Sequence, residues 1–259
     1  MLDNAFRLLT CCGRSIARGS QATPLLHGAT KDLARARRNK WLSTRRRARE
    51  ANRWSNESSL RWKGNLRQGK RRLSVVNQPS LDQHALVVVD VQQGFDDPAW
   101  GHRNNPACEG NIERLLTTWR RAGRPVVFVR HDSTTSGSPL RPGQPGNDLR
   151  PVLTGEPDLL VTKSVNSAFH GAPDLDAWLR GQGIPGVVIC GVTTNPCCET
   201  TARVAGNLGY DTVFVLDATH TFDRMGPDGG TVDADTLARV TATNLHGEFA
   251  DVVITDGVA

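Results

Sequence analysis

From residue 84 to the C-terminus, six short runs rich in valine, isoleucine and leucine alternate with longer polar segments. Nearly unbroken apolar runs of this length are typical of parallel strands that are covered on both faces. The predicted strands are 84–90, 125–131, 158–163, 186–190, 211–217 and 250–256, and the predicted helices are 107–123, 172–183 (starting at Pro173), 195–208 and 233–249. This order predicts an α/β fold with three layers, doubly wound around a six-stranded, mainly parallel sheet.

One connection breaks the alternation. Residues 132–157 contain five prolines and four glycines and have little periodicity. Long irregular connections in compact domains are usually lids, binding loops or disordered segments. We therefore expect residues 132–157 to form a wall or a lid over a site.

The first 80 residues have a different composition from the rest. They hold 19 Lys and Arg against 4 Asp and Glu, a net charge of +15, whereas residues 81–259 carry a net charge of −9. The basic part also lacks a periodic apolar face that could form a core. We predict a basic, disordered extension over residues 1–80 and one folded domain over residues 81–259.

The basic extension has two interpretations. Clustered arginines, such as Arg45, Arg46 and Arg47, could bind nucleic acid or an anionic membrane. Alternatively, the segment is a solvated leader or an upstream stretch translated from a misplaced start codon. No recognisable nucleic-acid-binding motif accompanies the charge, which favours the second interpretation. The sequence shows neither a secretory signal nor a membrane span, so we expect a cytoplasmic protein.

Residues at the carboxyl ends of the predicted strands are candidates for chemistry, because ligands of open α/β sheets bind there. These ends are Asp90, His131, Lys163, the turn 190–197 and Asp217. The set includes a carboxylate, a cation and a thiol.

The adjacent thiols Cys197 and Cys198 are expected to differ. Asn195 is a favourable N-cap and Pro196 a favourable first helical residue, so Cys197 would lie in the first turn of a helix. That position and a nearby lysine would lower the pKa of its thiol and make it open to rapid alkylation. Cys198 lies about 100° further round the helix and, like Cys190, is expected to pack in the core. Local spacing alone leaves open that Cys197 is only a small buried residue.

Three stretches carry a family resemblance. DVQQGF from Asp90, VTKSVNSAF around Lys163 and CGVTTNPCCETTA around Cys197 resemble, in order and spacing, the motifs of the isochorismatase-like cysteine hydrolase superfamily. That family includes nicotinamidases, carbamoylsarcosine-type amidohydrolases and isochorismatases. The resemblance runs from about residue 84 to the C-terminus and leaves the first 80 residues unexplained.

The resemblance implies a catalytic triad of Asp90, Lys163 and Cys197. It also implies a cis peptide bond between Val192 and Thr193, and an oxyanion hole made by the backbone N–H groups of Thr193 and Cys197. The carboxylate would accept the thiol proton, the lysine would hold both groups, and the sulfur would attack an amide carbonyl to form a thioester. The residues expected to line the substrate site are Phe95, His131 and Phe169.

Two departures from the family narrow the expected reaction. Nicotinamidases usually carry Asp-x-His and a further histidine as metal ligands after the second strand, but this chain has VRHDSTTSG there, with only His131. We therefore expect no catalytic metal and no cofactor. Isochorismatases proper cleave a vinyl ether without a cysteine nucleophile, so the presence of Cys197 favours hydrolysis of a C–N bond.

The expected substrate is a small amide or lactam. General sequence character favours an enzyme of the streptothricin hydrolase type, which opens the lactam of a basic antibiotic and so confers resistance. The acidic body is consistent with a cationic substrate, since Asp96, Asp97, Asp223 and Asp228 follow strand ends, although an ordinary acidic surface would look the same. A nicotinamidase- or carbamoylsarcosine-type amidase is the alternative, and the family suggests a homo-oligomer. A protein of another class, with a nucleic-acid-binding extension on a catalytically idle α/β scaffold, also stays open.

Overall fold

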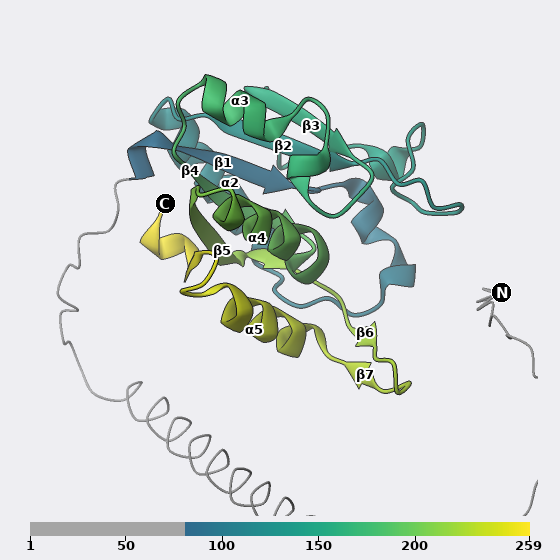
Figure 1. Cartoon of the computed structure of the whole chain (residues 1–259). Helices are drawn as coiled ribbons and strands as arrows, with labels where there is room; N and C mark the ends of the chain where they lie inside the picture. Colours follow the sequence, from purple (N-terminus) through teal and green to yellow (C-terminus); the bar gives the residue numbers. More distant parts are fainter. Residues whose placement is uncertain (1–80) are drawn as a thin grey trace, which may run out of the picture. The chain divides into compact units, whose positions relative to one another are not determined.

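The computed structural model describes residues 81–259 and contains a six-stranded parallel sheet. The strand order is β3-β2-β1-β4-β5-β8, with β1 at the centre, as in a doubly wound fold (Figure 1). The strands are β1 (His84–Val89), β2 (Val126–His131), β3 (Leu159–Lys163), β4 (Gly186–Val192), β5 (Asp211–His220) and β8 (Asp251–Val253). The predicted fold class is confirmed, and the predicted extension 1–80 lies outside the described residues.

Helices cover both faces of the sheet and make three layers. One face packs on α2 (Cys108–Arg121), while the other packs on α3 (Leu175–Gly181), α4 (Glu199–Asn207) and α5 (Ala234–Leu245). In Figure 1, α3 and α4 lie in front of the sheet and α2 lies behind it. All six residues of β1 are buried, which explains why its sequence is apolar without alternation.

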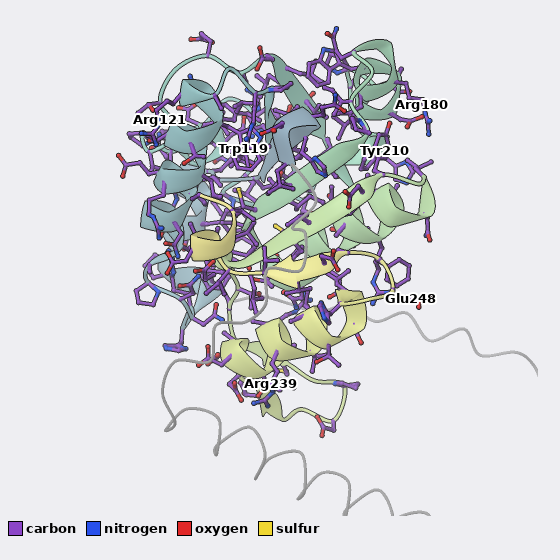
Figure 2. The ribbon with its side chains drawn as sticks, turned by 90° about the vertical axis from the view of Figure 1, so that its left-hand side faces the viewer. Trp119, Arg121, Arg180, Tyr210, Arg239 and Glu248 are labelled. Atoms are coloured by element: carbon purple, nitrogen blue, oxygen red, sulfur yellow. The ribbon has the colours of Figure 1, made fainter. Side chains whose placement is uncertain are left out.

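The apolar face that the sequence predicts for helix α2 packs against the sheet. Its apolar side chains Ile112, Leu115, Leu116 and Trp119 are buried against the sheet, and the indole Nε1 of Trp119 donates a hydrogen bond to the carbonyl of His84 at 2.9 Å. Arg121, two residues further along, is exposed and points away from the body (Figure 2). The predicted helical face is therefore the core-facing one.

Some predicted boundaries are wrong, for local reasons. Helix α3 begins at Leu175 rather than at Pro173, because Asp174 is the N-cap and accepts a hydrogen bond from the backbone N–H of Ala177. Helix α5 ends at Leu245, four residues before the predicted end. Strand β8 ends at Val253, and the chain then bends because Thr255 donates to the carboxylate of Asp217.

Strand β5 is longer than predicted and carries a register shift. It runs to His220 instead of residue 217, and its pairing with β4 shifts between Ile189 and Gly191. Gly191 has a φ of 124°, and a Cβ at this position would lie 2.1 Å from the carbonyl oxygen of Val89. Only glycine fits there, so Gly191 lets β1 and β4 approach closely just before the site.

Several short elements were not predicted. An antiparallel hairpin, β6 (Arg224–Met225) and β7 (Thr231–Val232), lies on the side of the molecule to which the strand arrows point (Figure 1). Single 3-10 turns occur at Leu81–Gln83, Gln93–Asp96, Pro98–Trp100, Pro145–Asn147, Ala168–His170 and Thr255–Gly257. Within residues 81–259, no helix is long and apolar enough to cross a membrane.

Candidate active site

Three strand ends bring a carboxylate, a lysine and a cysteine together. Asp90 directly follows β1, Lys163 is the last residue of β3, and Cys197 lies in the turn after β4. The Nζ of Lys163 donates to Oδ2 of Asp90 at 2.6 Å and to Sγ of Cys197 at 3.6 Å. The three residues that family motifs placed together are neighbours, although 107 positions separate the first from the last.

The pair Asp90 and Lys163 is excluded from water, since both side chains have an exposed fraction of 0%. Burial raises the pKa of the Asp90 carboxyl above its usual range, and the charge of Lys163 only partly opposes this. Burial also acts to lower the pKa of Lys163, but the negative charge of Asp90 outweighs it and the pKa is raised. Lys163 is therefore an ammonium at neutral pH, facing an unusually basic carboxylate.

The state of the Cys197 thiol differs from the prediction. Burial, followed by the negative charge of Asp90, raises its pKa well above the usual value, and Lys163 only partly opposes the rise. The exposed fraction of Cys197 is 8%, which accounts for the dominance of burial. The resting group is a neutral thiol that needs a base, so rapid alkylation at neutral pH is no longer expected.

The predicted helix start is also wrong. Residues Thr194–Cys198 form a π-helical turn before α4, and Asn195 lies inside this turn instead of capping it. Its side-chain oxygen accepts a hydrogen bond from Oγ1 of Thr221 at 2.6 Å, so it is not available to the backbone N–H groups of the turn. This hydrogen bond links the turn that contains Cys197 to the segment that follows β5. Cys198 is fully buried in the core, as predicted.

His131 lies beside Asp90, Lys163 and Cys197. It is the last residue of β2 and the register partner of Lys163, and its Nδ1 lies 3.3 Å from Nζ. Ligand-type atoms of Asp90, His131 and Cys197 lie within 4.8 Å of one another. All three residues contact the Lys163 ammonium, so a positive charge already occupies this cluster and would repel a metal cation.

The turn before the nucleophile has the expected backbone form, with a cis peptide bond between Val192 and Thr193. Thr193 and Cys197 both line a cavity of about 810 Å³. Asp90 and His131 also reach this cavity, whereas Lys163 lies behind them. The thiol, the carboxylate and the turn therefore face the same cavity.

One wall of the cavity is aromatic. Phe95, which was predicted to line the site, packs against Trp100 with ring centroids 5.1 Å apart, and Trp100 stacks on Phe222 at 5.6 Å. Phe169, the other predicted substrate-binding phenylalanine, does not line the cavity. It lies in the core and contacts the ring of Tyr210 at 5.8 Å.

Other lining residues were missed by reasoning from the sequence. They come from loops and from the hairpin, where neither periodicity nor strand ends mark a position. Two residues of the predicted lid, Thr135 and Leu140, also line the cavity. Asp217 was predicted to lie at a strand end, but it lies within β5 and accepts hydrogen bonds from Thr255. The missed residues are Ala99, Trp100, Asn166, Thr221, Phe222, Arg224 and Met225, whereas Asn195 and Pro196 belong to the turn 190–197 that was predicted.

Most of the aspartates that were considered as partners of a cationic substrate do not line the cavity. Asp96 pairs with Arg150, Asp97 accepts from the backbone of Ala99, and Asp228 accepts from Gly230. Of the four predicted carboxylates only Asp223 lines the cavity, next to Arg224. The cavity wall therefore carries both signs of charge.

Comparison with known proteins agrees with this geometry. The model of the isochorismatase domain matches residues 84–244. The isochorismatase-family protein YrdC of Bacillus subtilis is 38% identical over 68% of this chain and 94% of its own length. A crystal structure of an isochorismatase-family protein from Chromobacterium violaceum has a TM-score of 0.64 at 38% identity, covering 68% of this chain and 92% of that one.

Two relatives have named activities. Nicotinamidase 3 of Arabidopsis thaliana is 32% identical and covers 69% of this chain and 88% of its own length. Streptothricin hydrolase of Streptomyces noursei is 34% identical, but the match covers 54% of this chain and 50% of that protein. The motifs, the sheet and the domain match agree, and the chain belongs to the isochorismatase family of hydrolases.

Proposed function

We propose that this chain is a metal-independent cysteine amidohydrolase that cleaves a C–N amide bond of a small molecule through a thioester on Cys197. The family includes hydrolases that act on C–N bonds other than peptide bonds, such as a nicotinamidase and an N-carbamoylsarcosine amidase. The proposal rests on one observation. The buried ammonium of Lys163 contacts both the thiol of Cys197 and the carboxylate of Asp90, and these two groups line a cavity of about 810 Å³. A nucleophile, a base and a substrate space therefore coincide.

The first step is a proton transfer. Because burial raises the pKa of Asp90, its carboxylate is a better proton acceptor than an exposed one. Its Oδ2 is bonded to Lys163, while Oδ1 is buried and has no hydrogen-bond partner among the described residues. The proton of the Cys197 thiol passes to this carboxylate as the sulfur attacks the amide carbon.

The second requirement is to hold the negative charge that develops on the amide oxygen. The backbone N–H groups of Thr193 and Cys197 are proposed to donate to this oxygen, since both residues line the cavity beside the sulfur. Lys163 is an ammonium in the resting site, because the charge of Asp90 raises its pKa. Its role is to hold the sulfur and the carboxylate in place and to balance their charge.

The remaining steps return the enzyme to its starting state. The protonated Asp90 gives its proton to the leaving nitrogen as the C–N bond breaks, which leaves a thioester. The same carboxylate then takes a proton from water, whose oxygen attacks the thioester carbon. As the C–S bond breaks, Asp90 returns this proton to the leaving sulfur, which releases the acid and restores the carboxylate and the thiol. Apart from the substrate and the attacking water, these steps use only groups of the chain itself.

The cavity wall supports a substrate with a flat or apolar part near the amide. Phe95, Trp100 and Phe222 offer a continuous aromatic surface. The most specific candidate reaction is opening of the streptothricin lactam, supported by the partial match to streptothricin hydrolase, with Asp223 as the carboxylate that could face a cationic group. A nicotinamidase-type or carbamoylsarcosine-type amide is the alternative, supported by the wider match to Nicotinamidase 3 and by an N-carbamoylsarcosine amidase of related fold.

The test is a panel of amides followed by mass spectrometry. Streptothricin, nicotinamide and N-carbamoylsarcosine are incubated with the protein, and we expect a gain of one water on the lactam or release of ammonia from a primary amide. Rapid acid quenching should show an acyl adduct on the peptide that contains Cys197. Turnover that persists in Cys197→Ala would contradict the proposal.

A further inference from the structure

His131 has a role that the triad leaves unassigned. Its backbone is held on both sides, since its N–H donates to Oε1 of Gln92 at 2.8 Å and its carbonyl accepts from Nε2 of Gln92 at 3.0 Å. The side chain of Asn147 donates to the same carbonyl at 3.1 Å. Gln92 and Asn147 are both buried, so the imidazole starts from a rigid base.

The contact with Lys163 determines which ring nitrogen carries the proton. An ammonium has three donors and no lone pair, so it can only donate. Because Nδ1 of His131 lies 3.3 Å from Nζ, this nitrogen must be the acceptor, and the ring proton of the neutral imidazole must sit on Nε2.

The charge state agrees with this tautomer. Burial, followed by the positive charge of Lys163, lowers the pKa of His131, and the nearby carboxylates only partly oppose this. The imidazole is therefore neutral at pH 7. It faces the cavity, and no described protein group accepts a hydrogen bond from its Nε2.

We infer that the Nε2–H of His131 is the donor that fixes the substrate, by bonding to an acceptor atom that lies close to the scissile carbonyl. The inference rests on the proposed function, because it assumes that the substrate binds beside Cys197. One ring nitrogen of His131 lies within 4.8 Å of both the Asp90 carboxylate and the Cys197 sulfur, and the residue lines the cavity, so the imidazole borders the space where the scissile carbonyl must lie.

This donor defines a class of substrate. The preferred amide carries a carbonyl oxygen, a carboxylate oxygen or an unprotonated ring nitrogen near the scissile carbonyl. An ammonium group at the same place would face an N–H dipole with Lys163 behind it, and would be rejected. A cationic group is tolerated only further out, toward Asp223.

The first test is independent of activity. The full chain is labelled with 15N-histidine, and the His131 signals are assigned from their loss in His131→Gln. We expect a protonated Nε2, an unprotonated Nδ1, and titration below the usual range of histidine. A proton on Nδ1, or a cationic ring at pH 7, would overturn the inference while leaving the proposed nucleophile untouched.

The second test separates the two ring nitrogens by substitution. The amide nitrogen of glutamine can occupy the position of Nε2, whereas asparagine reaches only the position of Nδ1. With a substrate from the amide panel, we expect kcat/KM to fall about tenfold in His131→Leu and His131→Asn, mainly through KM, and to recover in His131→Gln. Rescue by asparagine but not by glutamine would show that His131 only supports Lys163, and would overturn the inference.

The third test addresses the substrate atom. Cys197→Ala is titrated with benzamide and with the three pyridinecarboxamides, which have the same shape and differ in one ring nitrogen. We expect at least one pyridinecarboxamide to bind about tenfold better than benzamide, and this advantage to disappear when His131→Leu is added. Equal affinities for all four probes would contradict the inference. His170→Asn, at an exposed histidine outside the cavity, is the matched control and should leave all readouts unchanged.

Discussion

The two sides of the cavity are built differently. The inner corner consists of Asp90, Lys163 and Cys197, which are buried, placed by central strands and bonded to one another. The outer wall includes the hairpin β6–β7, in which Met225 has an exposed fraction of 80%. The corner belongs to the core of the domain, and the hairpin has solvent around it.

This difference suggests which part carries out the reaction and which part determines the preferred substrate. A buried ion pair keeps its geometry because any displacement would leave a charge without a partner in a medium of low dielectric constant. An exposed hairpin has few such constraints, so its side chains can change at small cost to stability. We therefore expect substitutions in the corner to abolish the reaction and substitutions in the hairpin to alter which amide is preferred.

The largest expected effect comes from the nucleophile. Cys197→Ala removes the sulfur that forms the thioester, and kcat should fall by about a thousandfold or more. Steady-state kinetics with the amide found in the panel provides the measurement. Cys198→Ala, at the neighbouring core cysteine, is the control and should keep most of the activity. Equal losses in the two variants would contradict the assignment of Cys197 as the nucleophile.

The next effect couples activity to stability. Asp90→Asn removes the base and leaves the Lys163 ammonium buried without a counter-charge, so activity should fall about a hundredfold or more and the free energy of unfolding by about 3 kcal/mol. Adding Lys163→Met should restore much of the stability but none of the activity. Denaturant unfolding of both variants checks this, and a single variant as stable as the wild type would show that the pair is not a structural unit.

A smaller, graded effect is expected from pH. Asp90 must be deprotonated to act, and burial raises its pKa, so kcat/KM should rise with pH and reach its plateau above the range of an ordinary carboxyl. The plateau should extend to strongly alkaline pH, because the pKa of Lys163 is also raised. By linkage, the stabilisation that comes from the raised pKa of Asp90 is present at acidic pH and is lost as pH rises through that pKa, whereas the pairing of the carboxylate with Lys163 remains. A plateau that begins near pH 4 would argue against a buried base.

The smallest effect is expected at the outer wall. Met225→Ala and Arg224→Ala should change KM about two- to fivefold, in different directions for different amides, without altering the melting temperature. Val240→Ala, at an exposed valine on α5 outside the cavity, is the matched control. A large loss of kcat in the hairpin variants would mean that the hairpin takes part in the chemistry.

The sequence predicted the fold class because the pattern that encodes it is local. The apolar run 84–90 and the face of Ile112, Leu115 and Trp119 each specify one element, and their alternation specifies a doubly wound sheet. Boundaries were less accurate, because an N-cap at Asp174 or a side-chain bond from Thr255 to Asp217 overrides propensity. The cavity wall was largely missed, since Trp100, Phe222 and Met225 have no common sequence signal.

What the sequence determined by itself was the set of residues at the strand ends and their motifs, since strand polarity places Asp90, Lys163 and the Cys197 turn at one edge. Only the tertiary structure decided their states. A helix start predicts a lowered thiol pKa for Cys197, but burial and the neighbouring Asp90 raise it, and the direction of a pKa shift depends on the whole surroundings of a group. The proton of His131 was likewise decided by one contact, 3.3 Å from an ammonium that lies 32 positions away in the chain.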